Sequence, residues 1–276
     1  MTTTANETNR KVVLAARPRG LPSPTDFRLE EEPLASLADG QVRVEVSHLS
    51  IDAFIRTTLE TEAYHGSVPL GGTIIALGVG RVRESRSGDF APSDWVFGPL
   101  LAQSCATLPA ALLRRIEVER APATAYLGAL GLTTGQTAWV GVREVAKVKP
   151  GAAPDGVDVY FDNVGGPLLD VVLDQIELRA RVVICGAISQ YGGEVAKGVR
   201  GPSLYLRLAE RQSRMEGFAV THFPEALPRA EAELADWLRE GKVRLPEHVM
   251  KGLENFGGAL VTLFTGGHTG KLLLAV

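Results

Sequence analysis

Two side chains stand at the ends of apolar segments, where they could take part in chemistry. Asn163 follows the apolar segment Val157–Phe161. Tyr191 ends the loop after a second apolar segment, Arg181–Cys185. Ligands of α/β sheets bind at the carboxyl ends of strands, and a phenol can donate a hydrogen bond to an oxygen that gains negative charge. Asparagine before Gly-Gly is also a good turn former, and a loop tyrosine can simply pack and cap, so both alternatives stay open.

The elements that would position these side chains form a strand–helix–strand unit. Val157–Phe161 and Arg181–Cys185 are rich in apolar residues, as parallel strands covered on both faces are. Between them lie the turn Asp162–Gly166 and a stretch of helical periodicity, Leu168–Leu178. The unit predicts the second half of a dinucleotide-binding fold.

The first half of such a fold does not precede this unit. It would contain a strand, a Gly-x-Gly-x-x-Gly-like turn and a helix whose N-terminus holds the pyrophosphate. Instead, Val148–Gly151 leads almost directly into Val157. In the strand order 3-2-1-4-5-6, this loss leaves Val157–Phe161 without a neighbour. We expect that another segment covers this edge, that two copies pair there as a homodimer, or that the unit is poorly stable.

Outside this unit, the sequence predicts a β-rich part and a part that alternates helices with strands. The predicted strands are Val12–Ala15, Gln41–Val46, Gly72–Leu77, Val79–Arg83, Asp94–Phe97 and Lys271–Val276, and the predicted helical segments are Ala138–Lys149, Pro224–Glu240 and Gly258–Phe264. Frequent Gly and Pro turns between the early strands predict a small antiparallel barrel. From Thr124 onward the alternation is that of βαβ units.

The composition is that of an ordinary globular protein, and the partner we expect is a small-molecule substrate. A chain of 276 residues, 45% hydrophobic and 22% charged, suffices for one large or two ordinary domains. The net charge of −3 gives no reason to expect nucleic acid or an anionic membrane. Neither a signal peptide nor an apolar run of about 18 residues is seen, so we expect a cytoplasmic protein. Two cysteines and five histidines without zinc-site spacing predict no metal site.

Short motifs spread along nearly the whole chain occur in one fixed order. They are Asp26–Glu30, Leu49–Arg56, Gly78–Val82, Tyr126–Leu132, Gly135–Trp139, Asp155–Gly166, Cys185–Tyr191, Arg214–Phe218 and Gly252–Asn255. Together they resemble the zinc-independent medium-chain dehydrogenase/reductases, and within these the NADP-dependent alkenal/prostaglandin reductases, which are leukotriene B4 dehydrogenase-like.

This resemblance implies an α/β fold with a GroES-like β-barrel catalytic domain and a truncated Rossmann-like parallel-sheet domain. The barrel would span residues 1–124, the truncated cofactor domain residues 125–245, and residues 246–276 would return to the barrel. The implied cofactor is NADP. A βαβαβ half of roughly 60 residues is missing, and with it the phosphate-cradling turn and the basic residue that reads the 2′-phosphate.

The resemblance also implies roles for the loops. The loop that ends at Tyr191 would line the nicotinamide, and the tyrosine hydroxyl would donate to an enolate-like oxygen as hydride reaches the β-carbon. Tyr191 is therefore the candidate catalytic residue. The candidate cofactor-binding residues are Asn163, Cys185, Gly186, Ala187, Ile188, Ser189, Gln190, Tyr191, Phe218, Ala219 and Val220.

Three functions are compatible with this sequence. The first is NADP-dependent reduction of activated C=C bonds in enones or enals, which the retained loop Cys185–Tyr191 favours. The second is a degenerate, cofactor-free pseudoenzyme or binding module that uses the barrel cleft. The third is a cofactor-independent addition or cyclisation polarised by Tyr191. The missing phosphate turn favours the second and third.

Overall fold

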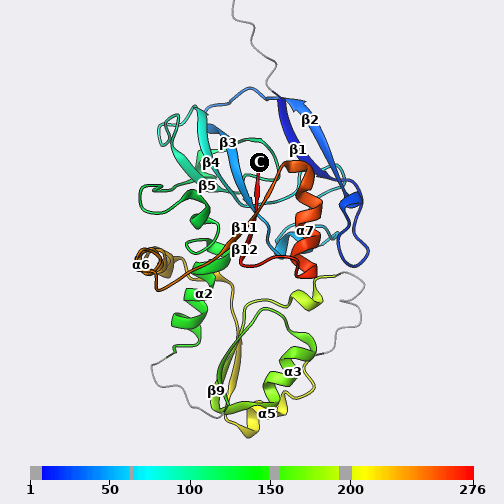
Figure 1. Cartoon of the computed structure of the whole chain (residues 1–276), viewed down its shortest axis with the longest axis vertical. Coiled ribbons are helices and arrows are strands. Elements are labelled where there is room, and N and C mark those ends of the chain that lie inside the picture. The colour runs from blue at the N-terminus through cyan, green and yellow to red at the C-terminus, as the bar shows by residue number, and fades with distance from the viewer. Residues whose placement is uncertain (1–7, 63–64, 149–155, 193–200) are drawn as a thin grey trace, which may run out of the picture. The chain divides into compact units, whose positions relative to one another are not determined.

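The chain folds into two compact units. The computed structural model describes residues 8–62, 65–148, 156–192 and 201–276. One unit combines residues 1–128 with 244–276, and the other spans residues 129–243 (Figure 1). Within the described residues, no helix is both long and apolar enough to cross a membrane.

The first unit is built on a largely antiparallel sheet in the order β11-β12-β3-β4-β5-β7, with β6 also beside β3. The long β3 pairs with β4 on one edge and with β6 and β12 on the other. The bounds of the strands in this unit are β1 Thr8–Leu14, β2 Phe27–Pro33, β3 Gln41–Ser50, β4 Gly78–Ser85, β5 Trp95–Gly98, β6 Cys105–Pro109, β7 Arg114–Arg115, β11 Glu247–Lys251 and β12 Lys271–Ala275. These bounds confirm most of the predicted strands.

The predicted strand Gly72–Leu77 is wrong, because this segment changes partner along its length. The Ile74 N–H donates to Val12 of β1, whereas the Leu77 carbonyl accepts from Ser50 of β3. Its middle carbonyls accept from the loop at residues 101–102. No single neighbour therefore runs beside it, and it connects β1 to the main sheet as an irregular segment.

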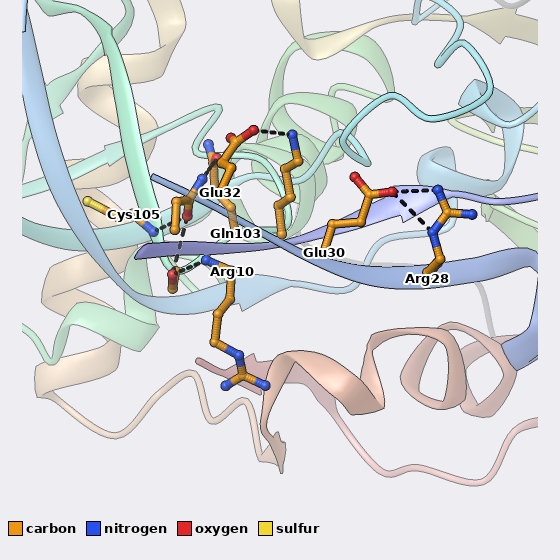
Figure 2. A network of polar contacts seen from close by, with 9 residues as sticks. Arg10, Arg28, Glu30, Glu32, Gln103 and Cys105 are labelled. Carbon is orange, nitrogen blue, oxygen red and sulfur yellow. Dashed lines mark hydrogen bonds and ion pairs between the residues drawn. The ribbon is translucent and has the colours of Figure 1, made fainter. Parts of the chain in front are cut away.

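A buried amide fixes β1 to the segment before β6. Asn9 is 5% exposed, and its Oδ1 accepts the Cys105 N–H at 3.0 Å while its Nδ2 donates to Gln103 at 2.8 Å. Figure 2 shows this network beside two ion pairs, Lys11–Glu32 at 2.5 Å, which joins β1 and β2, and Arg28–Glu30 within β2. Buried polar groups need such partners, whereas exposed ion pairs contribute little, so the amide network does more to hold β1.

Two buried charges connect distant parts of the first unit. Arg56 of α1 (Phe54–Thr58) is 0% exposed, and its Nε and Nη2 donate to the Gly20 carbonyl at 3.0 and 2.9 Å. The Nζ of Lys271, at the start of β12, lies 2.5 Å from Oδ1 of Asp52. Helix α7 (Phe256–Thr265) packs on the same core through Phe256, whose ring meets Phe27 edge-on at 5.8 Å. The C-terminal segment therefore completes the barrel core.

The second unit contains a parallel sheet in the order β10-β9-β8. Its elements are β8 Val157–Asp162, α3 Gly166–Asp174, β9 Ile176–Ile184, α5 Leu206–Glu210 and β10 Arg214–Gly217. Helices α3 and α5 cover one face, where Leu173 and Leu208 pack with Val182 of β9 (Figure 1). This arrangement confirms the predicted strand–helix–strand unit and the truncated parallel-sheet domain.

The predicted helix Leu168–Leu178 is too long at its C-terminal end. Helix α3 ends at Asp174, and β9 begins at Ile176. The pairing of β8 with β9 explains the difference, because Val157 pairs with Ile176 and the register then shifts before Val159 pairs with Arg181. Strand pairing overrides the helical periodicity of this stretch.

Helical segments cover the other face of the parallel sheet. Helix α2 (Thr137–Val140) continues through wider turns at residues 132–136 and 141–145. Two arginines of the sheet hold the C-terminal end of this helical segment. Arg181 donates to the Ala146 carbonyl at 2.9 Å, and Arg214 donates to the Val145 carbonyl at 2.7 Å. Helix α6 (Leu227–Arg239) packs on α2 and confirms the predicted amphipathic helix. Its Glu233 carboxylate accepts a hydrogen bond from Trp139 Nε1–H at 3.0 Å.

Strand β8 is the edge of this sheet. Among the described residues it pairs with β9 alone, as the sequence predicts. The described part of the predicted helical segment, residues 138–148, covers one face of β8 through Val145 and Ala146, which pack with Val159 and Phe161, but it adds no strand. The junction at residues 149–155, from which the missing half-domain was inferred, lies outside the described residues.

We predict that the protein self-associates through the edge of β8, since an unpaired edge strand is a template for a second strand. Sedimentation velocity from about 1 to 100 µM should show a growing dimer fraction. A substitution such as Val159→Lys is a poor test, because Val159 packs in the core beside Val145 and a lysine there would unfold the unit. A single monomeric species at every concentration would contradict the prediction.

Candidate functional site

The predicted site residues gather at one edge of the parallel sheet. Because β8, β9 and β10 run in the same direction, their carboxyl ends meet there. The turn Asp162–Gly166 follows β8, the loop Cys185–Tyr191 follows β9, and residues 218–220 follow β10. The Phe218 N–H donates to the Ile184 carbonyl at 3.2 Å, so the third segment is attached to the second strand.

The first two of these segments are joined by hydrogen bonds. The bonds run from Cys185 N and Gly186 N to the Asp162 carbonyl at 2.8 and 3.1 Å, from Ile188 N to the Asn163 carbonyl at 2.9 Å, and from Ser189 N and Ser189 Oγ to the Val164 carbonyl at 3.2 and 2.5 Å. The loop Cys185–Tyr191 is thus tied down on the turn after β8. Its shape is formed without any ligand.

Glycine is required at two positions where these segments touch. Gly165 has φ 67° and ψ −156°, a conformation that side chains strongly disfavour. A Cβ there would also lie 3.2 Å from the Ala187 side chain. At Gly186, a Cβ would lie 2.9 Å from the Tyr191 hydroxyl. Both glycines therefore permit the close approach of the turn and the loop.

The structure brings Tyr191 and Asn163 to the same place. The Tyr191 hydroxyl accepts the Ala187 N–H at 3.3 Å, so its own proton is left to donate. A Cβ at Gly186 would lie 3.5 Å from Asn163 Oδ1, which places both polar groups against one glycine. The Asn163 side chain is exposed and has no hydrogen bond among the described residues. These two side chains are the groups that a ligand at this edge would meet.

Asp162 holds the turn together, and the sequence analysis missed it. This aspartate is 1% exposed. Its Oδ1 accepts the Val164 and Gly165 N–H groups at 2.8 and 2.9 Å and the Tyr160 hydroxyl at 3.1 Å. Its Oδ2 is buried and has no hydrogen-bond partner among the described residues. Aspartate at the start of a turn that bonds the backbone two residues on is a known pattern, and it was the available signal.

Burial and this aspartate shift the pKa values of two neighbours. Burial, followed by the hydrogen bond and charge of Asp162, raises the pKa of Tyr160 to about 12. Burial, and then the charge of Asp162, raise the pKa of the Cys185 thiol to about 11. Since the thiolate is the nucleophilic form, Cys185 is a poor nucleophile at neutral pH. Its part in the site is structural.

The third predicted segment, residues 218–220, differs from the other two because it packs against the core through an aromatic ring. The Phe218 ring packs edge-on against Phe161 at 6.0 Å and Phe223 at 6.1 Å, so it supports the core beneath the site. Ala219 and Val220 are half-buried at the same edge. Within the described residues, no three His, Cys, Asp or Glu side chains are placed to hold a metal ion.

Comparison with known proteins matches both units to oxidoreductases. A family described as the N-terminal domain of oxidoreductase matches residues 10–116, and one described as zinc-binding dehydrogenase matches residues 136–274. A putative NADP-dependent oxidoreductase of Bacillus subtilis is 30% identical, with 97% of each chain covered. An NADP(+)-dependent 2-alkenal reductase of Nicotiana tabacum is 28% identical, also with 97% of each covered. The crystal structure of CurA from Vibrio vulnificus, solved with NADPH, matches with a TM-score of 0.87 at 23% identity. The match covers 97% of this chain and 99% of the CurA chain.

The lengths of these alignments show that this chain is shorter than the relatives it matches. The alignment to the B. subtilis protein spans 336 positions, although 97% of this 276-residue chain is only about 268 residues. Some 70 positions of the alignment therefore have no counterpart here, which is about the size of two βαβ crossovers. Because both chains are covered almost to their ends, the missing positions are internal.

We predict that Gly165→Ala destabilises the protein, whereas Gly217→Ala does not. The first change forces a side chain into a conformation that costs about 1–3 kcal/mol and crowds Ala187. The second lies at the same sheet edge, where a Cβ would have its nearest neighbour at 3.9 Å. Urea unfolding measures both. Equal midpoints would show that the turn does not need glycine.

We also predict slow alkylation of Cys185, measured in a Cys105→Ala background. With a pKa near 11 rather than 9.0, the thiolate fraction near pH 8 is about 100-fold below that of an ordinary cysteine. The alkylation rate should rise from about pH 8 to about pH 10 without a plateau. A plateau at the pKa of a free cysteine would refute the shift.

Proposed function

The chain belongs to the zinc-independent medium-chain dehydrogenase/reductase family, and on that premise we propose that it is an NADP-dependent oxidoreductase that reduces activated C=C bonds of enones or enals. One observation carries the proposal. The loop Cys185–Tyr191 presents the Tyr191 hydroxyl at the carboxyl edge of the parallel sheet, and the neighbouring turn presents the exposed Asn163 amide, which no described residue bonds. The named activities of the relatives support the same chemistry.

The nicotinamide end of the cofactor fits this edge better than its phosphates do. Half-buried apolar residues, Ala187, Ile188 and Val220, lie there beside the exposed Asn163 amide, a combination suited to an apolar ring that carries a carboxamide. Hydride transfer is the chemistry that a reduced nicotinamide supplies when bound. The phosphates are considered separately below.

Tyr191 is the residue that polarises the acceptor in this proposal. Reduction of an enone adds hydride to the β-carbon, moves the C=C electron pair toward the carbonyl and leaves negative charge on the oxygen. A proton from solvent at the α-carbon then completes the saturated product. The Tyr191 proton is free to donate to that oxygen, and the N–H that its own oxygen accepts from Ala187 strengthens it as a donor.

The remaining residues hold Tyr191 in place. Gly186 lets the hydroxyl approach the backbone, and Asp162 fixes the turn on which the loop is seated. Neither residue needs to touch the substrate in order to affect the rate, because a small displacement of a donor in a reaction site is costly. In this proposal Gly186 and Asp162 act as positioning residues.

A panel of 2-alkenals and enones tests the proposed activity. Purified protein is mixed with NADPH at millimolar concentration, and the loss of reduced-nicotinamide absorbance is followed together with product analysis by mass spectrometry. Saturation of the C=C bond with the carbonyl intact is expected. Absence of turnover across the panel would instead support a binding module.

We predict that Tyr191→Phe lowers kcat 10²- to 10³-fold, the usual cost of removing an oxyanion donor. The ring and its packing are kept, so the change in unfolding free energy should be about 1 kcal/mol, from the Ala187 N–H that loses its acceptor. Stopped-flow kinetics and urea unfolding measure the two effects. Tyr205→Phe is the matched control, because Tyr205 is 66% exposed before α5 and belongs to none of the three site segments. Equal kcat in the parent and Tyr191→Phe would remove Tyr191 from the mechanism.

A further inference from the structure

A phosphate bound at a sheet edge needs backbone N–H groups that have no other partner. In dinucleotide-binding folds these come from a glycine-rich turn and the helix N-terminus that follows it. The described part of the second unit has one comparable place, the turn Asp162–Gly166 before α3. Its donors can be followed one by one.

Two backbone N–H donors of this turn are already committed to an internal anion. The N–H groups of Val164 and Gly165 donate to the carboxylate of Asp162 at 2.8 and 2.9 Å, and Pro167 in the first turn of α3 has no N–H. Asp162 thus occupies the position that a phosphate oxygen would take, and its negative charge would repel a second anion.

The backbone N–H groups of the neighbouring loop are bonded within the protein as well. Every backbone N–H from Cys185 to Tyr191 donates within the protein. The acceptors are the carbonyls of Asp162, Asn163, Val164, Ala187 and Ile188 and the hydroxyl of Tyr191. A phosphate could be bound here only by breaking bonds that hold the loop in shape.

The part of the fold that would supply other donors is the part that this chain lacks. The described sheet holds only β8, β9 and β10, which correspond to one of the two mononucleotide-binding halves of a Rossmann fold. The 7 residues from 149 to 155 are far fewer than the roughly 60 that the other half needs. The alignment to the B. subtilis protein leaves about 70 positions without a counterpart in this chain, a total of that size.

We propose that the remaining half-site recognises only the nicotinamide–ribose end of the cofactor. The inference rests on the proposed function and narrows it. NADPH, NADH, reduced nicotinamide mononucleotide and reduced nicotinamide riboside should then bind with similar affinity, because the described backbone N–H groups of Val164, Gly165 and the loop Cys185–Tyr191 are already bonded within the protein and are not available to the pyrophosphate or the 2′-phosphate.

Asn163 is the side chain on which this recognition depends. It is the exposed polar group at the sheet edge and lies beside the glycine that the Tyr191 hydroxyl contacts. An amide can both donate to and accept from the carboxamide of a nicotinamide. All four ligands share that carboxamide, so loss of Asn163 should weaken them equally.

Ligand-observed NMR on the nicotinamide protons provides one readout for all four ligands. We expect Kd values in the millimolar range that agree within about threefold, because each charge-assisted phosphate contact that is absent is worth about tenfold or more in Kd. Asn163→Ala should raise all four Kd values by the same factor, about 3- to 10-fold. Gln175→Ala is the matched control, since this exposed amide precedes β9 at the opposite end of the sheet and should change none of them.

The outcomes separate this inference from the proposed function. NADPH binding tenfold or more tightly than NADH and the riboside would overturn the inference and leave the reductase proposal standing. Absence of binding by all four ligands at about 10 mM, well above the expected millimolar Kd, would overturn both. An unchanged Kd in Asn163→Ala would remove the nicotinamide contact assigned to this residue and with it the inference.

Discussion

The buried carboxylate of Asp162 is the interaction on which the site depends. It lies at the carboxyl end of β8, accepts two N–H groups of the turn and one hydroxyl, and its backbone carbonyl accepts two more N–H groups from the loop after β9. A buried charge is costly unless such donors surround it. The three bonds to the carboxylate offset this cost, and together with the two bonds to the backbone carbonyl they bring Asn163 and Tyr191 together.

The internal anion also explains how a shortened cofactor unit can have an ordered ligand edge. In a complete dinucleotide-binding fold, ordering of the phosphate turn is shared with the ligand. Here the turn supplies its own anion, so the loops need no phosphate to be satisfied. On the proposed function, the turn makes no phosphate contact and the two loops form the nicotinamide edge, so the two ends of the cofactor are expected to differ in importance.

The three-stranded sheet keeps a core because both of its faces are covered. Helices α3 and α5 pack on one side, and the helical segment that contains α2 packs on the other. Arg181 and Arg214 reach across to the last carbonyls of that segment, which links the sheet to its cover by charge-assisted bonds. The missing neighbours therefore leave the edge of β8 open while its side chains stay packed.

The sequence alone determined the family, the barrel, the parallel strands and the segments that carry the site, because apolar periodicity and short motifs are local properties of the chain. It also revealed the lost half-domain, since a missing turn is visible without coordinates. Three things depended on tertiary structure. Strand pairing ended α3 at Asp174, changing partners kept Gly72–Leu77 out of the sheet, and the role of Asp162 followed from donors that reach it from two loops. Each depends on which groups meet in space, and residues 20 or more positions apart leave no periodic trace of such meetings.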